Sequence, residues 1–383
     1  MPSIPASASP VLSVRDLEVE FSTADGLVSA VNGVGFDLAA GETLAILGES
    51  GSGKSVTAQA VMGLIERPGR VVAGSVSFGG VDLLAGSDED RRRVRGSGLA
   101  MVFQDPLSAL NPVWSVGFQI GELFRVHRGL GRREARRRAV ELLERVRIPA
   151  AAQRVGQYPH QFSGGMRQRV MIAMALALDP KVLIADEPTT ALDVTVQAQI
   201  LELLDDLRAE TGMGLLLITH DLGVVAETAD RVAVMYAGRI VETGPTDGVL
   251  SAPAHPYTEG LLASVPRGQS GREHRLRPIA GAPPSLARIP SGCPFHPRCP
   301  YVIDRCRSER PPLAPVVTEV DPAGTLGRNR PAFPGRILPG TDETQAEGGT
   351  GGGSGRGGPT VGAAGSTRAA ACWRSEEVGH VER

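Results

Sequence analysis

Short, mostly apolar runs are the clearest pattern along the chain. Four of them stand well apart, at residues 42–47, 99–103, 182–185 and 214–219. An apolar run of this length without alternation is typical of a strand buried on both faces, as in a parallel sheet. Segments with helical spacing lie between these runs, which predicts an α/β fold around a mostly parallel sheet. The expected helices span residues 56–65, 166–178 and 196–211.

Other segments alternate apolar and polar residues, the pattern of strands with one buried face. Residues 11–20 alternate in this way, and a second strand at 27–31 follows a turn. A hairpin is expected at residues 74–83, and a terminal strand pair at 231–236 and 239–242. We therefore expect an antiparallel β subdomain beside the parallel sheet.

A block rich in Ala, Arg, Glu and Leu occupies residues 113–157. Its apolar residues recur at helical spacing, as at Ala139, Leu142 and Val146. The block predicts a small all-helical subdomain, from about residue 105 to residue 178, inserted into the α/β core.

The α/β core, residues 1–250, is expected to end near Leu250, because proline then becomes frequent and the periodicity short. An irregular extension is expected at 251–321 and a tail at 369–383. Between them, residues 322–368 contain a stretch rich in Gly, Ser and Thr and are expected to be a flexible insertion.

Composition and charge exclude several classes of protein. The 383 residues carry a formal net charge of −2, so no overall basic field favours nucleic acid or an acidic membrane surface. The arginine-rich segments 91–95 and 132–147 are interleaved or flanked with acidic residues and are interpreted as solvated faces. No apolar run approaches the ~20 residues of a membrane-spanning helix, and residues 1–10 lack the features of a signal peptide. We expect a soluble, cytoplasmic protein that reaches a membrane only through a partner.

The strand at 42–47 leads directly into a loop that matches the phosphate-binding pattern G-x-x-x-x-G-K-[ST]. Its glycines allow backbone N–H groups to curl around phosphate oxygens, and its lysine brings a positive charge to the β- and γ-phosphates. Its serine offers a hydroxyl to Mg²⁺. The order of strand, loop and helix predicts a nucleotide cradle formed by Gly48, Glu49, Ser50, Gly51, Ser52, Gly53, Lys54, Ser55 and Val56.

Polar residues follow two more of the apolar runs. Asp186 and Glu187 come after the run at 182–185, at the carboxyl end of a strand, where open α/β sheets bind their ligands. His220 ends the run at 214–219, which we expect at the same edge. Upstream, a Ser-Gly-Gly turn precedes a predicted helix, whose free backbone N–H groups can bind phosphate.

The stretch from Tyr158 to Gln197 resembles the segment from the signature motif to Walker B in the ATP-binding-cassette (ABC) ATPases. More narrowly, Tyr158-Pro-His-Gln161 and Thr189-Thr-Ala-Leu-Asp-Val-Thr-Val-Gln197 resemble the ATPase subunits of oligopeptide and dipeptide importers, as does Leu110-Asn-Pro112. The resemblance implies an α/β P-loop NTPase (RecA-like) core with an antiparallel β subdomain, an inserted α-helical subdomain and an irregular C-terminal extension.

The resemblance also implies roles in the hydrolysis of ATP with Mg²⁺. Glu187 would polarise the attacking water as general base, and His220 would steady that water and the γ-phosphate. Gln104 would touch the metal and relay the nucleotide state to the helical subdomain. Ser55 and Asp186 would complete the metal site, directly or through water.

In the family, an aromatic side chain near this point of the chain stacks on adenine, and Phe21 is the candidate. The alternative is that Phe21 is a core aromatic at a strand end. The Ser163-Gly164-Gly165 turn caps the γ-phosphate held by a second subunit, so two ATPs are sandwiched between two chains. Asp193 would cross that dimer interface.

By the same resemblance, the chain would energise an importer at the cytoplasmic face of the plasma (inner) membrane. Its partners would be a second ATPase subunit, giving a heterodimer, two integral-membrane permeases and an extracytoplasmic peptide-binding protein. Nickel or another small solute is an alternative cargo. A soluble ABC ATPase acting on nucleic acid or ribosomes is a less favoured alternative, since such proteins usually carry two cassettes or a long coiled coil and this chain has one P-loop and one signature.

Three cysteines cluster in the extension, and one more lies in the tail. A cytosolic cluster argues for metal rather than disulfides, and its spacing is wider than the CxxC pairs of zinc ribbons. The segment resembles the Cys-Pro-Phe-His-Pro-Arg-Cys-Pro extension of peptide-importer ATPases, some of which hold an iron–sulfur cluster on four cysteines. The resemblance thus implies a [4Fe-4S] cluster on Cys293, Cys299, Cys306 and Cys372, the last reaching the site across the insertion. Unligated thiols in a docking tail are the alternative.

Overall fold

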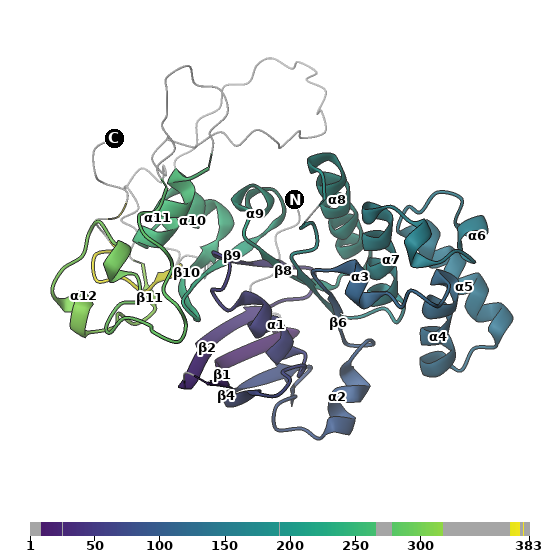
Figure 1. The fold of residues 1–383 in the computed structure, drawn as a ribbon, viewed down its shortest axis with the longest axis horizontal. Helices are drawn as coiled ribbons and strands as arrows, with labels where there is room; N and C mark the ends of the chain where they lie inside the picture. The colour runs from purple at the N-terminus through teal and green to yellow at the C-terminus, as the bar shows by residue number, and fades with distance from the viewer. Residues whose placement is uncertain are drawn as a thin grey trace, which may run out of the picture.

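The computed structural model describes residues 9–24, 26–190, 192–265, 278–316, 368–375 and 378. The expected insertion at 322–368 lies outside these residues, apart from Arg368. The described chain has an α/β core, with the helical subdomain at one end and the C-terminal extension at the other (Figure 1).

Within the described residues, the main sheet has eight strands in the order β11-β12-β10-β9-β3-β8-β7-β6. Their bounds are β3 Thr43–Leu47, β6 Leu99–Val102, β7 Val182–Asp186, β8 Gly214–Thr219, β9 Arg231–Tyr236, β10 Arg239–Pro245, β11 Ala314–Pro315 and β12 Ala369–Ala370. The strands from β9 to β6 run parallel, and β3, β6, β7 and β8 are buried along their whole length. The unbroken apolar runs are explained by this burial on both faces, so the predicted parallel sheet is confirmed.

A second, antiparallel sheet has the order β2-β1-β4-β5. Its strands are β1 Leu12–Thr23, β2 Gly26–Leu38, β4 Gly69–Phe78 and β5 Val81–Asp82. Its apolar face packs with α1 (Lys54–Val61) against the main sheet, in a cluster that includes Leu17, Ala58 and Ile184. The short exposed helix α2 (Asp88–Val94) carries much of the first arginine-rich segment. The predicted β subdomain is confirmed, although β2 continues well beyond the expected residue 31.

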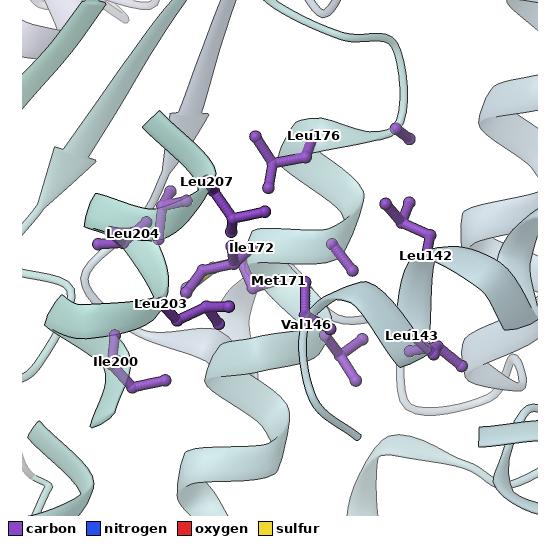
Figure 2. Packing of buried hydrophobic residues seen from close by; sticks show 14 of the residues in the cluster. Leu142, Leu143, Val146, Met171, Ile172, Leu176, Ile200, Leu203, Leu204 and Leu207 are labelled. Carbon is purple, nitrogen blue, oxygen red and sulfur yellow. The ribbon is translucent and has the colours of Figure 1, made fainter. Parts of the chain in front are cut away.

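Helices form the opposite end of the molecule. They are α3 Pro106–Ala109, α4 Val116–Arg128, α5 Arg132–Arg145, α6 Ala151–Arg154, the 3₁₀ turn η1 Pro159–Gln161 and α7 Gly164–Leu176. Leu143 and Val146 lie at the end of α5, close to Met171 on α7 (Figure 2). The same core cluster continues to α8 (Val194–Thr211) through Leu203, so the helical subdomain is packed onto the core.

Two local expectations are corrected. The helix after the P-loop ends at Val61, not at residue 65, because Gly63 adopts a left-handed conformation (φ 64°) that ends the helix. Two prolines and an asparagine in residues 105–112 predict a loop, but this segment contains the one-turn helix α3, since the Asp105 side chain accepts a hydrogen bond from the Leu107 N–H and Pro106 occupies the first turn.

The C-terminal extension packs onto the core. It contains α10 Thr246–Ser251, α11 Pro256–Ala263, the 3₁₀ turn η2 His296–Arg298 and α12 Arg305–Ser308, and it lies near α9 Leu222–Thr228. Tyr257 and Phe295 are buried against Tyr236 of β9, with ring centroids 4.6 and 5.3 Å from the Tyr236 ring. The extension also supplies the edge strand β11, and the tail supplies the edge strand β12. It therefore shares an apolar cluster and a sheet with the core.

A buried ion pair fixes the end of the chain to this edge. Glu242 of β10 is fully buried, and its carboxylate accepts hydrogen bonds from the Ala254 and His255 N–H groups and from Arg368 (3.0 Å). The Val316 N–H donates to the carbonyl oxygen of Arg368. The chain thus leaves the described region at Val316 and returns beside it.

The buried histidine of the extension predicts a pH-dependent stability. His255 is 1% exposed, its Nδ1 accepts the Tyr257 N–H, and burial lowers the pKa of His255 from 6.5 to about 3. Between these values the unfolded chain binds a proton that the folded chain does not, so stability is lost as the pH falls below about 6.5. Between pH 7.5 and 5.5, wild type should lose about 1.4 kcal/mol more unfolding free energy than His255→Asn, whose amide oxygen can accept the same N–H. Urea unfolding at the two pH values measures the difference; equal losses would contradict it.

Candidate functional site

The P-loop joins β3 to α1 and is shaped by two of its glycines. Gly48 passes so close to β9 that a Cβ there would collide with the carbonyl oxygen of Met235. Gly53 adopts φ 104° immediately before α1, and a Cβ there would collide with the carbonyl oxygen of Ala30. The backbone path of the P-loop therefore requires glycine at these two positions.

Lys54 lies inside this loop and is 4% exposed. Its Nζ donates to the carbonyl oxygens of Gly48 (2.9 Å) and Glu49 (3.0 Å). Burial lowers the pKa of Lys54, while the charges of Glu187, Asp186 and Glu49 oppose that shift. The ammonium group is thus held at the mouth of the cradle, 3.9 Å from Glu187 Oε1.

Ser55 and Asp186 meet across the sheet edge. The Ser55 hydroxyl donates to Asp186 Oδ1 at 2.9 Å, and Asp186, at the end of β7, is 4% exposed. Burial raises the pKa of Asp186, and the hydrogen bond from Ser55 counteracts it. An oxygen-only pair of this kind has the donor chemistry that Mg²⁺ prefers.

The Glu187 carboxylate is surrounded by four groups from different parts of the chain. Oε2 accepts hydrogen bonds from Gln104 Nε2 and from the Thr190 hydroxyl, both at 2.9 Å. On the other side, Oε1 lies 3.4 Å from His220 Nδ1 and faces Lys54. The structure thus brings together the candidates that the sequence placed at one sheet edge.

The Glu187 side chain is held firmly in place. Its backbone has φ 45°, an uncommon value for a residue with a Cβ, and its N–H donates to the carbonyl oxygen of Ile218 in β8. Thr190 was noted in the sequence only as part of a motif. Its contact with the carboxylate depends on the tight turn after Glu187, which no local pattern predicted.

The Ser-Gly-Gly turn lies on the helical subdomain and is exposed to solvent at Ser163 and Gly164. Ser163 caps α7, accepting a hydrogen bond from the Met166 N–H. Gly165 passes so close to Val196 of α8 that a Cβ would collide with it. Among the described residues, no hydrogen bond joins this turn to the P-loop, so the turn is open to another molecule.

Three further candidates have local contacts. Asp193 is exposed and caps α8, accepting a hydrogen bond from the Val196 N–H at 3.0 Å. Phe21 is partly buried and packs against the cluster beneath the β subdomain, with its ring beside Gly69. Val56 is part of α1 and is partly buried. These contacts establish structural roles for all three residues.

The four cysteines lie close enough to influence one another's ionisation. Burial raises the pKa of Cys299 to about 12 and that of Cys372 to about 11, and the neighbouring cysteines add to both shifts. Burial also raises the pKa of Cys293, with Cys306 contributing. However, no three His, Cys, Asp or Glu side chains in the described part of the chain are near enough to hold a metal ion. The described residues therefore give no support for the expected [4Fe-4S] site.

The glycine cradle, the buried Ser55–Asp186 pair and the enclosed Glu187 carboxylate define a P-loop ATPase of the ATP-binding-cassette class. Comparison with known proteins agrees. The ABC transporter family matches residues 31–190, and the oligopeptide/dipeptide transporter C-terminal region matches residues 241–306.

Similar proteins cover nearly all of the described chain. A Brucella melitensis protein named as a peptide import ATP-binding protein is 54% identical over 321 residues, which are 81% of this chain and 95% of that protein. The oligopeptide transport ATP-binding protein OppD of Bacillus subtilis is 54% identical over 307 residues, covering 80% and 86% respectively. This chain therefore belongs to the ABC transporter ATP-binding proteins, in the branch that carries the oligopeptide/dipeptide C-terminal region, and it hydrolyses ATP.

Solved structures are similar over the cassette. The dimeric, ADP- and Pi-bound post-hydrolysis state of the ATP-binding cassette MJ0796 has a TM-score of 0.56 and 27% identity, covering 61% of this chain and 98% of that chain. The cbiO1 structure from Clostridium perfringens has a TM-score of 0.55 and 31% identity, covering 64% and 92%. In the described part of this chain, no helix is both long enough and apolar enough to cross a membrane.

The enclosure of Glu187 predicts the effect of a single substitution. Glu187→Gln keeps the size of the side chain and its contact with Gln104 but removes the carboxylate that could accept a proton. ATP binding should persist, turnover should fall by about 10²–10⁴-fold, and a nucleotide-bound dimer should accumulate. Phosphate release, nucleotide binding and size-exclusion chromatography with ATP measure the three effects. Turnover like that of wild type would remove Glu187 from the role of general base.

Proposed function

We propose that this chain is the ATP-hydrolysing subunit that energises an importer of oligopeptides or dipeptides. The observation that carries the proposal is the pairing of the complete ATP site with an extension of the oligopeptide/dipeptide transporter type at residues 241–306. Relatives that are 54% identical to it over 321 and 307 residues are named for peptide import and oligopeptide transport. Nickel or another small solute is the alternative cargo.

The geometry supports a division of roles at the ATP site. The P-loop amides and Lys54 bind the phosphates. Ser55, Asp186 and Gln104 would hold Mg²⁺, and the ion would supply positive charge against the phosphate oxygens. Glu187 accepts a proton from the attacking water, and His220, 3.4 Å from that carboxylate, orients the water and the γ-phosphate. Catalysis of this kind is mainly positioning and charge stabilisation.

Two chains complete each site in this proposal. Ser163, Gly164 and Gly165 are placed on the outside of the helical subdomain, where they can cap the γ-phosphate of an ATP bound by a second ATPase subunit. Asp193 is exposed at the start of α8 and can reach the same interface. Phe21 is assigned to the adenine side of the site. The motifs around Gly48 and Thr190 favour a heterodimer with a second, different ATPase.

An exposed apolar patch marks where a membrane permease would bind. We define the coupling patch as Phe103, Leu107, Val113, Trp114 and Phe118, whose exposure runs from 38% to 70%. The rings of Trp114 and Phe118 stack at 4.5 Å. The coupling patch begins next to Gln104, whose side chain donates a hydrogen bond to Glu187. A cytoplasmic segment of a permease bound to the patch would therefore be separated from the ATP site by the Gln104 side chain alone. This arrangement fits a peripheral position on the inner membrane, with an extracytoplasmic binding protein delivering the solute.

Growth and uptake assays test the assignment. Cells that lack this chain should lose uptake of labelled di- and oligopeptides; wild type should restore it, and Glu187→Gln should not. Trp114→Asp should reduce uptake at least tenfold through loss of permease binding while retaining basal ATPase activity, because it places a charge in an apolar interface. Val126→Asp, at an exposed apolar position of α4 outside the coupling patch, is the matched control. Loss of nickel uptake with normal peptide uptake would support the alternative cargo.

We also propose that Cys293, Cys299, Cys306 and Cys372 bind a [4Fe-4S] cluster. Cys306 is buried and Cys293, Cys299 and Cys372 are partly buried in the same region of the fold. Four thiols suit such a cluster, because its iron would compensate the negative charge of the thiolates that form when binding removes their protons.

Anaerobic purification decides this proposal. About four iron and four sulfide per chain, with a broad visible absorption that is lost in Cys372→Ser, are expected. Stoichiometric zinc without iron, or no metal at all, would contradict it. Cys372→Ser should leave ATP binding measurable, which separates the cluster from the ATPase.

A further inference from the structure

An ion pair joins the P-loop to the cysteine-containing extension. Arg298, in the Cys-Pro-Phe-His-Pro-Arg-Cys-Pro segment, donates from Nη1 and Nη2 to the two carboxylate oxygens of Glu49 at 2.7 and 3.1 Å. Glu49 is the first residue after Gly48. The P-loop and the cysteine-containing segment of the extension are therefore partners in space.

The contact is enclosed and well defined. The Arg298 side chain is 5% exposed and that of Glu49 is 27% exposed. The guanidinium also lies within 5.9 Å of the ring centroids of Tyr236 and Phe295. A two-pronged arginine–carboxylate pair that is largely shielded from water is stronger and more directional than a surface ion pair.

The extension holds the backbone of Glu49 as well as its side chain. The Glu49 N–H donates to the Tyr257 hydroxyl at 2.8 Å. A cavity of about 340 Å³ separates Ser50, Gly51 and Ser52 from residues 283–287 of the extension. One flank of the P-loop is thus built from residues more than two hundred positions away.

The Arg298–Glu49 contact affects ATP binding because Glu49 is negatively charged. Glu49 is a negative group in a loop that binds anionic phosphates, and its charge already acts on Lys54. Left alone, its carboxylate would repel ATP and attract the lysine that must meet the phosphates. Arg298 is the cation that the described structure places on that carboxylate.

We propose that Arg298 is a positioning residue of the nucleotide site: it neutralises and anchors Glu49, and so keeps the P-loop open to the phosphates of ATP. The extension then contributes to ATP binding through Arg298. This inference concerns the nucleotide site alone and holds whichever solute the transporter carries.

Steady-state kinetics of the full-length protein with MgATP test the proposal. Arg298→Gln leaves Glu49 charged, so KM for ATP should rise about tenfold while kcat changes less than twofold. Arg298→Lys keeps the positive charge but cannot form the bidentate contact, so it should recover part of the affinity for ATP. Glu49→Gln combined with Arg298→Gln should return KM to within about threefold of wild type, because no unpaired charge remains.

Arg307→Gln is the matched control, since Arg307 is an exposed arginine of the same extension. Its KM should equal that of wild type. The shift of the unfolding temperature caused by ATP, measured against each nucleotide-free variant, separates ATP affinity from folding. A wild-type KM in folded Arg298→Gln, or a double variant as impaired as Arg298→Gln, would overturn the proposal. Should Arg298→Gln not fold, Arg298→Lys and the double variant carry the same test.

Discussion

The parallel register of β3, β8 and β7 is the constraint on which the site depends. Leu47 pairs with Thr219, and Ile218 pairs with Asp186, so the three strands end at one edge. The first residues beyond them include Gly48, Glu187 and His220. A shift of one residue in any strand would turn its side chains to the opposite face and separate these groups. Close packing of specific side chains on both faces opposes that shift, which links the apolar runs to the chemistry at their ends.

Most of the core could be predicted because its strands and its P-loop are encoded by short, continuous stretches of sequence. Unbroken apolar runs gave the buried strands, and the P-loop pattern gave the order of strand, loop and helix around it. Contacts between distant segments could not be found in this way. Thr190 reaches Glu187 only because the chain turns sharply after β7, and Arg298 reaches Glu49 only because aromatic packing places the extension against β9. Neither contact has a periodicity or a spacing that the sequence displays.

Negative charge is concentrated around a site that must bind an anion, and each carboxylate has a partner from a different part of the fold. Asp186 accepts from Ser55 in α1, and Glu187 is enclosed by groups that follow three strands and the P-loop. Glu49 is paired by the extension. The groups that compensate these carboxylate charges thus come from the α/β core, from the boundary of the helical subdomain and from the C-terminal extension.

The pairing of Glu49 with a residue 249 positions later has a consequence for synthesis. A ribosome delivers the P-loop early, but the cation that balances it leaves the exit tunnel only when most of the polypeptide has been made. Emerging chains would therefore acquire full affinity for ATP late in translation. If Arg298 supports ATP binding as proposed, a nascent subunit would bind nucleotide weakly until its C-terminal region has folded.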